Sequence, residues 1–170
     1  MKKNLLLLLL IVLTIGQVNA AKKYKYTFNP PFEVEEVMIA KHGTNFVKSW
    51  AVDKNADKAI IKAKQNAILA VLFTGIPGNQ VKGTNGIRPI CYEGQVVYEQ
   101  HKEYFDNFMI SGEFLEYIKD INSTYPTGPD NVETPNGRRV GVNLQILNKL
   151  LRERLEKDGI ISELGKQLNL

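Results

Sequence analysis

The sequence has too few cysteines and histidines to build a disulfide framework or a common zinc site. It contains one cysteine, Cys91, and two histidines, His42 and His101, in 170 residues. A single cysteine cannot form a disulfide within the chain. Neither an HExxH motif nor paired CxxC spacing is present. We therefore expect no metal site and no cofactor, and a fold that is stabilised by a hydrophobic core.

The sequence also lacks a large excess of charge of either sign. It has 22 Lys and Arg residues against 18 Asp and Glu residues, a formal net charge of +4. Lys2 and Lys3 contribute two of these charges and lie in a segment that we expect to be removed. The remaining charge is too small to predict binding to nucleic acid or to an anionic membrane surface.

Long hydrophobic runs are confined to the start of the chain. Lys2 and Lys3 precede an apolar stretch from Leu5 to Ile15, and small residues follow up to Ala20. This order is typical of a secretory signal peptide, with cleavage after Ala20. The alternative, an uncleaved anchor, needs an apolar helix of ~20 residues. No cysteine lies near the cleavage point, so we expect an exported protein, periplasmic or secreted, with no lipid anchor and no transmembrane segment after cleavage.

The rest of the chain divides into three parts. Residues 21–32 are basic and aromatic and end in two prolines, which predicts an extended arm. Residues 33–160 have the length and composition of one domain, and residues 161–170 form a C-terminal tail. Within the arm, aromatic residues alternate with lysines, a pattern that fits contact with a sugar or another chain, or a poorly ordered segment: Lys23, Tyr24, Lys25, Tyr26 and Phe28.

Residues 55–75 predict the central helix of the domain. Alanines recur at steps of three and four and form one line along a helix: Ala56, Ala59, Ala63, Ala67 and Ala70. Small side chains let a helix lie close to a β-sheet. Asp53 or Asn55 can cap the start of this helix, and Gly75 can end it.

Three segments have the pattern of strands. Residues 33–40 and 46–52 are β-prone and are separated by a turn near Gly43, which predicts a hairpin, although the first could begin as a short helix. Residues 138–146 alternate strictly between apolar and polar side chains, which predicts a strand with one buried face.

The remaining periodic segments are helical. Residues 96–108 predict a second helix with an aromatic inner face, and residues 113–121 fit either a helix or a strand. Asn148 can cap a final helix that carries Leu150, Leu151 and Leu155. These elements predict an α+β fold with two layers, in which two or three helices cover one face of an antiparallel sheet of three to five strands.

Residues 76–94 are the candidate partner surface. Glycines and prolines are so frequent in this segment that we expect a long loop without regular structure. Long loops in compact domains are often functional, although a decorative insertion fits the pattern equally well. The loop combines apolar anchors with positive charge, as recognition surfaces do. The candidate contact residues are Ile76, Val81, Lys82, Ile87, Arg88 and Ile90.

Few residues could carry catalysis. Cys91 and His101 are the possible thiol and imidazole pair, but no known motif surrounds Cys91. Paired carboxylates could act as acid and base, although adjacent acids are usually just solvated: the pairs are Glu35 with Glu36, and Glu113 with Glu116. The glycines at 78, 83 and 86 form the pattern G-x4-G-x2-G, which lacks the lysine and hydroxyl of a phosphate-binding loop.

The order of segments NADKAIIKAKQNAILAVLFTG, YFDNFMISGEFLEYI and GRRVGVNLQILNKLLRERLEKDGI resembles the amino-terminal domain of the flagellar-assembly protein FlgT and related small outer-membrane lipoproteins, over roughly residues 33–160. The resemblance implies helices on a sheet, and a role in envelope assembly without catalysis. This chain departs from the pattern because it has no lipidated cysteine and a longer glycine-rich loop. We expect a non-catalytic binding or assembly module whose partner is another envelope protein. The alternative is a periplasmic hydrolase that uses Cys91 or a carboxylate pair.

Overall fold

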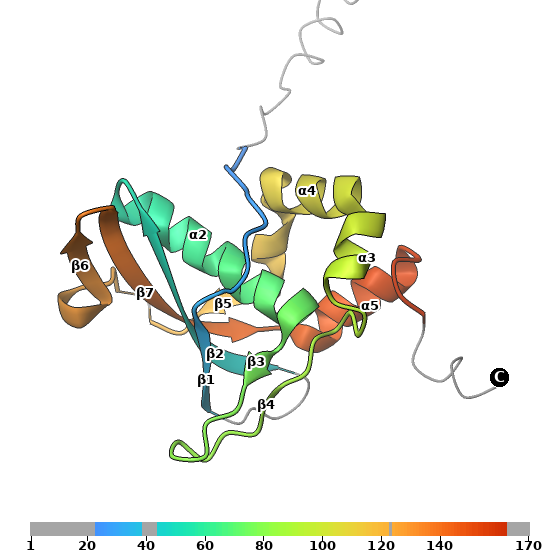
Figure 1. Ribbon diagram of the computed structural model, residues 1–170, viewed down its shortest axis with the longest axis horizontal. Coiled ribbons are helices and arrows are strands. Elements are labelled where there is room, and N and C mark those ends of the chain that lie inside the picture. The colour runs from blue at the N-terminus through green and yellow to red at the C-terminus, as the bar shows by residue number, and fades with distance from the viewer. Residues whose placement is uncertain (1–22, 39–43, 123, 163–170) are drawn as a thin grey trace, which may run out of the picture.

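The computed structural model describes residues 23–38, 44–122 and 124–162 (Figure 1). The predicted signal peptide, the turn predicted near Gly43 and most of the predicted tail lie outside these residues. No helix within the described ranges is long and apolar enough to cross a membrane.

The predicted α+β class is confirmed, with an antiparallel sheet of five strands. Its strand order is β1-β2-β7-β5, and β6 pairs with the first half of β7. The strands are β1 (Val34–Met38), β2 (Asn45–Asp53), β5 (Ile118–Asp120), β6 (Asn131–Thr134) and β7 (Gly137–Ile146). The three predicted strands correspond to β1, β2 and β7. The sequence pattern did not indicate β6, which prolines and glycines surround.

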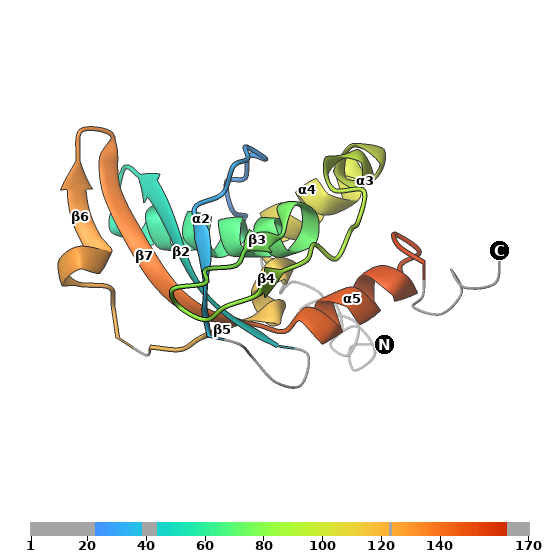
Figure 2. The same ribbon diagram turned by 60° about the horizontal axis from the view of Figure 1, so that its bottom comes forward.

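Helix α2 (Ala56–Leu69) lies across one face of the sheet (Figures 1 and 2). Ala59, Ala63 and Ala67 are fully buried in the core, as the alanine spacing predicted. Ser49 on β2 donates a hydrogen bond of 2.8 Å to the carbonyl of Ala63, so helix and strand are in direct polar contact. The small side chains make this approach possible, because a larger residue would hold the helix away from the sheet.

Both ends of this helix agree with the sequence. Asn55 is the N-cap, and its side-chain oxygen accepts a hydrogen bond of 3.0 Å from the backbone N–H of Lys58. The chain continues from α2 into a π-helical turn, η1 (Ala70–Thr74), which the pattern did not predict. Gly75 then ends it at a φ of 69°, a conformation that favours glycine.

The predicted helix over residues 96–108 is two helices, α3 (Gln95–Gln100) and α4 (Lys102–Ser111). The backbone leaves the helical region at His101, where φ is −118° and ψ is 32°. Neither glycine nor proline stands at this position to signal a break. Both helices direct aromatic rings into the core, where Tyr98 and Phe105 pack on Phe73 at ring-centroid distances of 5.6 and 4.8 Å.

Residues 113–121 combine both alternatives, because a 3₁₀ turn η2 (Glu113–Tyr117) leads into β5. A second 3₁₀ turn, η3 (Gly128–Asp130), precedes β6. Helix α5 (Asn148–Lys157) follows β7 and extends beyond its end (Figure 2).

The prediction of Asn148 as the N-cap of α5 is wrong. The cap residue is Leu147, and Asn148 is already inside the first turn with its side-chain oxygen buried and without a hydrogen-bond partner. The helix starts one residue earlier than expected because the backbone turns directly after β7. Leu151 and Leu155 are fully buried, whereas Leu150 is 51% exposed.

The arm is extended and packs onto the domain instead of being poorly ordered. The backbone N–H of Tyr24 donates to the carbonyl of Ile110 at 2.8 Å, and the side chain of Gln65 donates to the carbonyl of Lys25 at 3.0 Å. Phe28 stacks on Tyr98 with ring centroids 4.1 Å apart. Residues 23–32 therefore complete the hydrophobic core.

Candidate functional site

The segment that was predicted as an irregular loop forms a short β-hairpin. Its strands are β3 (Ile76–Pro77) and β4 (Gly86–Ile87), which pair antiparallel. Gly86 has a φ of 83°, and a Cβ at this position would lie 2.6 Å from the backbone nitrogen of Gly78. The glycines therefore let two backbones approach closely, which explains their spacing without a bound phosphate.

Hydrogen bonds order the turn of this hairpin. The backbone N–H of Asn79 donates to the hydroxyl of Thr84 at 2.9 Å, and the N–H of Thr84 donates to the carbonyl of Asn79 at 3.0 Å. The side-chain oxygen of Asn79 accepts from the N–H of Val81 at 3.0 Å. Thr84 is buried, whereas Val81 is 98% exposed. The turn thus holds an aliphatic side chain in solvent on an ordered backbone.

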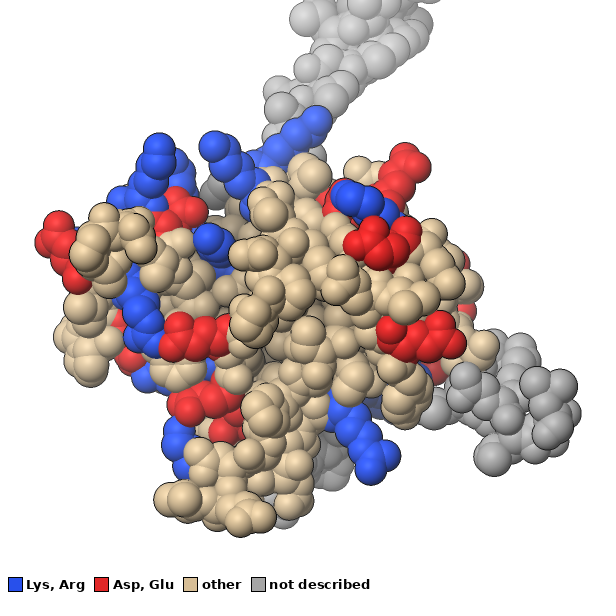
Figure 3. All heavy atoms as spheres, in the orientation of Figure 1, with Lys and Arg blue, Asp and Glu red and all other residues tan. Residues whose placement is uncertain are grey.

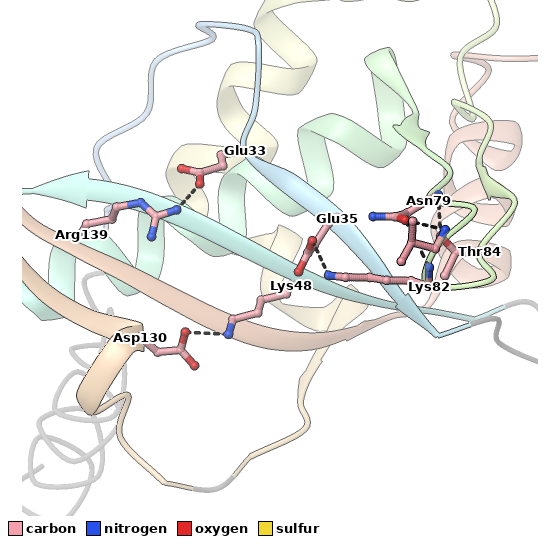
Figure 4. Close-up of polar contacts among 9 residues, drawn as sticks. Glu33, Glu35, Lys48, Asn79, Lys82, Thr84, Asp130 and Arg139 are labelled. Atoms are coloured by element: carbon pink, nitrogen blue, oxygen red, sulfur yellow. Dashed lines mark hydrogen bonds and ion pairs between the residues drawn. The ribbon is translucent and has the colours of Figure 1, made fainter.

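Two glutamates of β1 attach the hairpin to the sheet. Glu36 is 5% exposed, and its carboxylate accepts a hydrogen bond of 2.8 Å from the backbone N–H of Gly86. Glu35 forms an ion pair of 2.7 Å with Lys82 (Figure 4). Neighbouring residues of a strand point to opposite faces, so Glu35 and Glu36 act separately and do not form an acid and base pair.

The structure divides the candidate contact residues into two groups. Ile76, Ile87 and Ile90 belong to the core, with 3%, 9% and 4% of their surface exposed. They therefore anchor the hairpin and are not available to a partner. Val81, Lys82 and Arg88 are exposed. The centre of Figure 3 shows few charged side chains, whereas charged side chains border it at the top and on the left.

The sheet face turned away from α2 carries the single tryptophan of the chain, whose role the sequence pattern did not reveal. Trp50 is paired across the strands with Gly141, where a Cβ would lie 2.6 Å from the indole nitrogen. The cationic groups of Lys48 and Arg139 lie 5.2 and 5.3 Å from the ring centroid. The sequence alone does not show that Gly141 lies opposite Trp50, because this pairing depends on the register of β2 on β7.

Ion pairs connect this face to the neighbouring elements (Figure 4). Lys48 pairs with Asp130 of η3 at 2.6 Å, and Arg139 pairs with Glu33 at the end of the arm. Because these side chains are partly exposed, each pair contributes only about 0.2–1 kcal/mol to stability. Their main effect is to orient the cations over the tryptophan.

A cleft of about 830 Å³ lies between the arm, β2 and α2. This volume is within the range of about 300–1,000 Å³ that is usual for ligand sites. Lysines of the arm and of α2 line it, together with the end of β2: Lys23, Lys25, Lys58, Lys62, Trp50, Val52 and Asp53. No pattern in the sequence indicated this cleft, because its walls are brought together only by the fold.

The groups proposed for hydrolysis are poorly suited to it. Cys91 is 1% exposed, and burial raises its pKa to about 12. The thiol therefore stays protonated at neutral pH, when it is a weak nucleophile. His101 lies at the junction of α3 and α4. Glu113 forms an ion pair with Arg154, whereas Glu116 is exposed.

The described residues contain no group of three or more His, Cys, Asp or Glu side chains that could hold a metal ion. Comparisons with protein-family models, curated proteins and solved structures found no significant match to this chain.

Proposed function

We propose that this protein is an exported, non-catalytic binding or assembly module of the bacterial cell envelope, and that it contacts another envelope protein through the tip of the β3–β4 hairpin. The proposal agrees with what the resemblance to the FlgT amino-terminal domain implies. The observation that carries it is the placement of Val81, a fully exposed aliphatic residue at the end of an ordered hairpin.

Burial of Val81 by a partner would supply a favourable free energy. Transfer of a valine side chain from water into an apolar contact stabilises a complex by roughly 1.5–3 kcal/mol. The hydrogen bonds between Asn79 and Thr84 already order the turn, so that binding costs little additional conformational entropy. The contacts of Glu36 with Gly86 and of Glu35 with Lys82 hold the hairpin on β1 and fix the direction in which the tip points.

The surface next to the tip fits this role as well. The centre of Figure 3, next to the hairpin, shows few charged side chains, and the centres of protein interfaces are depleted of charge. Lys82 is neutralised by Glu35, whereas Arg88 has no ion-pair partner among the described residues. Arg88 is thus available to a carboxylate at the rim of the interface.

Site-specific photo-crosslinking in the native envelope tests the proposal. A crosslinking residue at the exposed position Gln80 should form one discrete adduct, and Val81→Asp should abolish it without a change in melting temperature. The matched control is Val96→Asp, on α3, where the native valine is 53% exposed. Loss of the adduct in the control, or an unchanged adduct in Val81→Asp, would show that the hairpin tip is not the contact surface.

The competing function is a periplasmic hydrolase, and a chemical experiment separates the two. The untreated protein is assayed against ester and amide substrates, and the assay is repeated for the Cys91→Ala and Glu113→Gln variants. A hydrolytic activity that either substitution removes would overturn the module proposal.

A further inference from the structure

The edge of β2 is only partly covered by β1. The register of β1 on β2 ends at Val34 opposite Ser49, whereas β2 continues to Asp53 and pairs with β7 along its whole length. At this point the chain leaves the sheet as the arm, and the backbone N–H of Trp50 donates to the carbonyl of Glu33 at 2.9 Å. Residues 51–53 have no strand beside them on this edge in the described part of the chain.

Side chains of α2 occupy the hydrogen-bonding positions that a neighbouring strand would use. The amide of Asn66 donates to the carbonyl of Trp50 at 3.1 Å, and the ammonium of Lys62 donates to the carbonyl of Val52 at 3.2 Å. Both contacts are single side-chain bonds near solvent. An incoming backbone can replace them at little cost, because the amide and ammonium groups can rebind to water or to the partner.

Four lysines and three carboxylates line the cleft beside this edge, which is an excess of one positive charge. Lys23, Lys25, Lys58 and Lys62 line it, and none forms an ion pair with a described carboxylate. Basic side chains gather over the arm and α2 at the upper left of Figure 3.

The three carboxylates of the cleft already have partners. Glu33 pairs with Arg139. Asp57 accepts a hydrogen bond from the hydroxyl of Tyr125 at 3.1 Å, and Asp53 accepts one from the backbone N–H of Lys54 at 2.7 Å.

We propose that this cleft binds an acidic segment of a partner protein in an extended conformation, which adds a strand to the free edge of β2. Backbone hydrogen bonds to the carbonyls of Trp50 and Val52 would supply affinity, as in other complexes formed by strand addition. Carboxylates of the segment would pair with the lysines, and Lys62 would exchange the carbonyl of Val52 for a carboxylate. The site is separate from the tip of the β3–β4 hairpin.

A fluorescent peptide of alternating glutamate and valine provides the probe. Binding to the full mature chain is compared with binding of a peptide in which lysine replaces glutamate, and with a copy whose backbone amides are methylated on one edge. The first peptide should bind, the lysine peptide should not, and methylation should abolish binding because it removes the donors of the added strand.

Variants of the protein provide the second comparison. Lys58→Gln combined with Lys62→Gln should weaken binding about tenfold through loss of two ion pairs. Lys119→Gln combined with Lys157→Gln, outside the cleft, should leave it unchanged, and Val81→Asp should also leave it unchanged. The last variant distinguishes failure at this cleft from failure of the hairpin contact.

The opposite results overturn the proposal. Equal binding of the methylated peptide would show that charge alone is recognised, without strand addition. An equal loss of peptide binding in the two double lysine variants would show a nonspecific response to net charge. Binding of an anionic polysaccharide such as polygalacturonate, with no binding of the acidic peptide, would assign the cleft to a glycan.

Discussion

Ala63→Leu tests the close contact between α2 and β2 on which the two-layer fold depends. Ala63 is fully buried, and its carbonyl accepts the hydroxyl of Ser49 at 2.8 Å. A leucine at this position adds three carbon atoms where no space exists for them. Overpacking of this kind costs about 1–3 kcal/mol.

The expected change is large enough to measure by thermal unfolding. For a domain of this size, a destabilisation of about 1–3 kcal/mol lowers the melting temperature by roughly 3–15 °C. Lys58→Leu is the matched control, since it introduces the same side chain on the exposed side of the same helix. Its melting temperature should stay close to that of the unchanged protein.

A double-mutant cycle identifies the cause of the destabilisation. Ser49→Ala alone removes the hydrogen bond to α2 and should cost about 1 kcal/mol. If the leucine pushes the helix from the strand, this bond is already lost in Ala63→Leu. The double variant should then be destabilised by less than the sum of the two single variants. Full additivity, or an unchanged melting temperature in Ala63→Leu, would refute the packing argument.

Three further predictions concern the hairpin and the buried thiol. Gly86→Ala should destabilise the protein by more than about 1 kcal/mol in chemical denaturation, because φ is positive and the new Cβ would lie 2.6 Å from a backbone atom. Gly83→Ala is the control and should cost less, because no atom lies within 4 Å of a Cβ at that position. Glu36→Ala should speed hydrogen exchange at the Gly86 amide, which loses its acceptor, and unchanged exchange would exclude this contact. Burial raises the pKa of Cys91 from 9.0 to about 12, so the folded state favours the protonated thiol. The stability that the buried thiol contributes is therefore complete below pH 9 and is lost as the pH rises from about 9 to 12. Cys91→Ala should remove this part of the alkaline loss, and iodoacetamide should label the native thiol at pH 7.5 far more slowly than the denatured one.

Local periodicity explains why much of the fold was predictable. The alanine line of α2 and the alternation in β7 repeat every 3.6 and 2 residues, and each repeat reports directly which face is buried. Asn55 was identifiable as a cap because it bonds to the N–H of Lys58, only three residues away. Where the helix after Gly94 breaks at His101, no residue type marks the position, and the pattern alone predicted one continuous helix.

The hairpin shows the limit of such patterns. Its glycines and prolines correctly excluded long helices and strands, yet they also concealed a two-residue pairing of Ile76 with Ile87. Apolar residues in a breaker-rich segment fit either exposed anchors or buried ones. Ile76, Ile87 and Ile90 are buried, and only Val81 is fully exposed, which no local signal distinguishes.

The sequence by itself therefore determined the elements whose partners are close in the chain: the alanine helix, its cap and the alternating strand. Tertiary structure decided which distant groups meet. Glu36 bonds to Gly86 across 50 residues, and Arg139 pairs with Glu33 across 106. Trp50 rests against Gly141 because β2 pairs with β7 in one register, and a shift of a single residue would move every side chain to the opposite face. The lysine cleft likewise exists only because the arm folds back over α2, a contact that depends on long-range packing and on no local repeat.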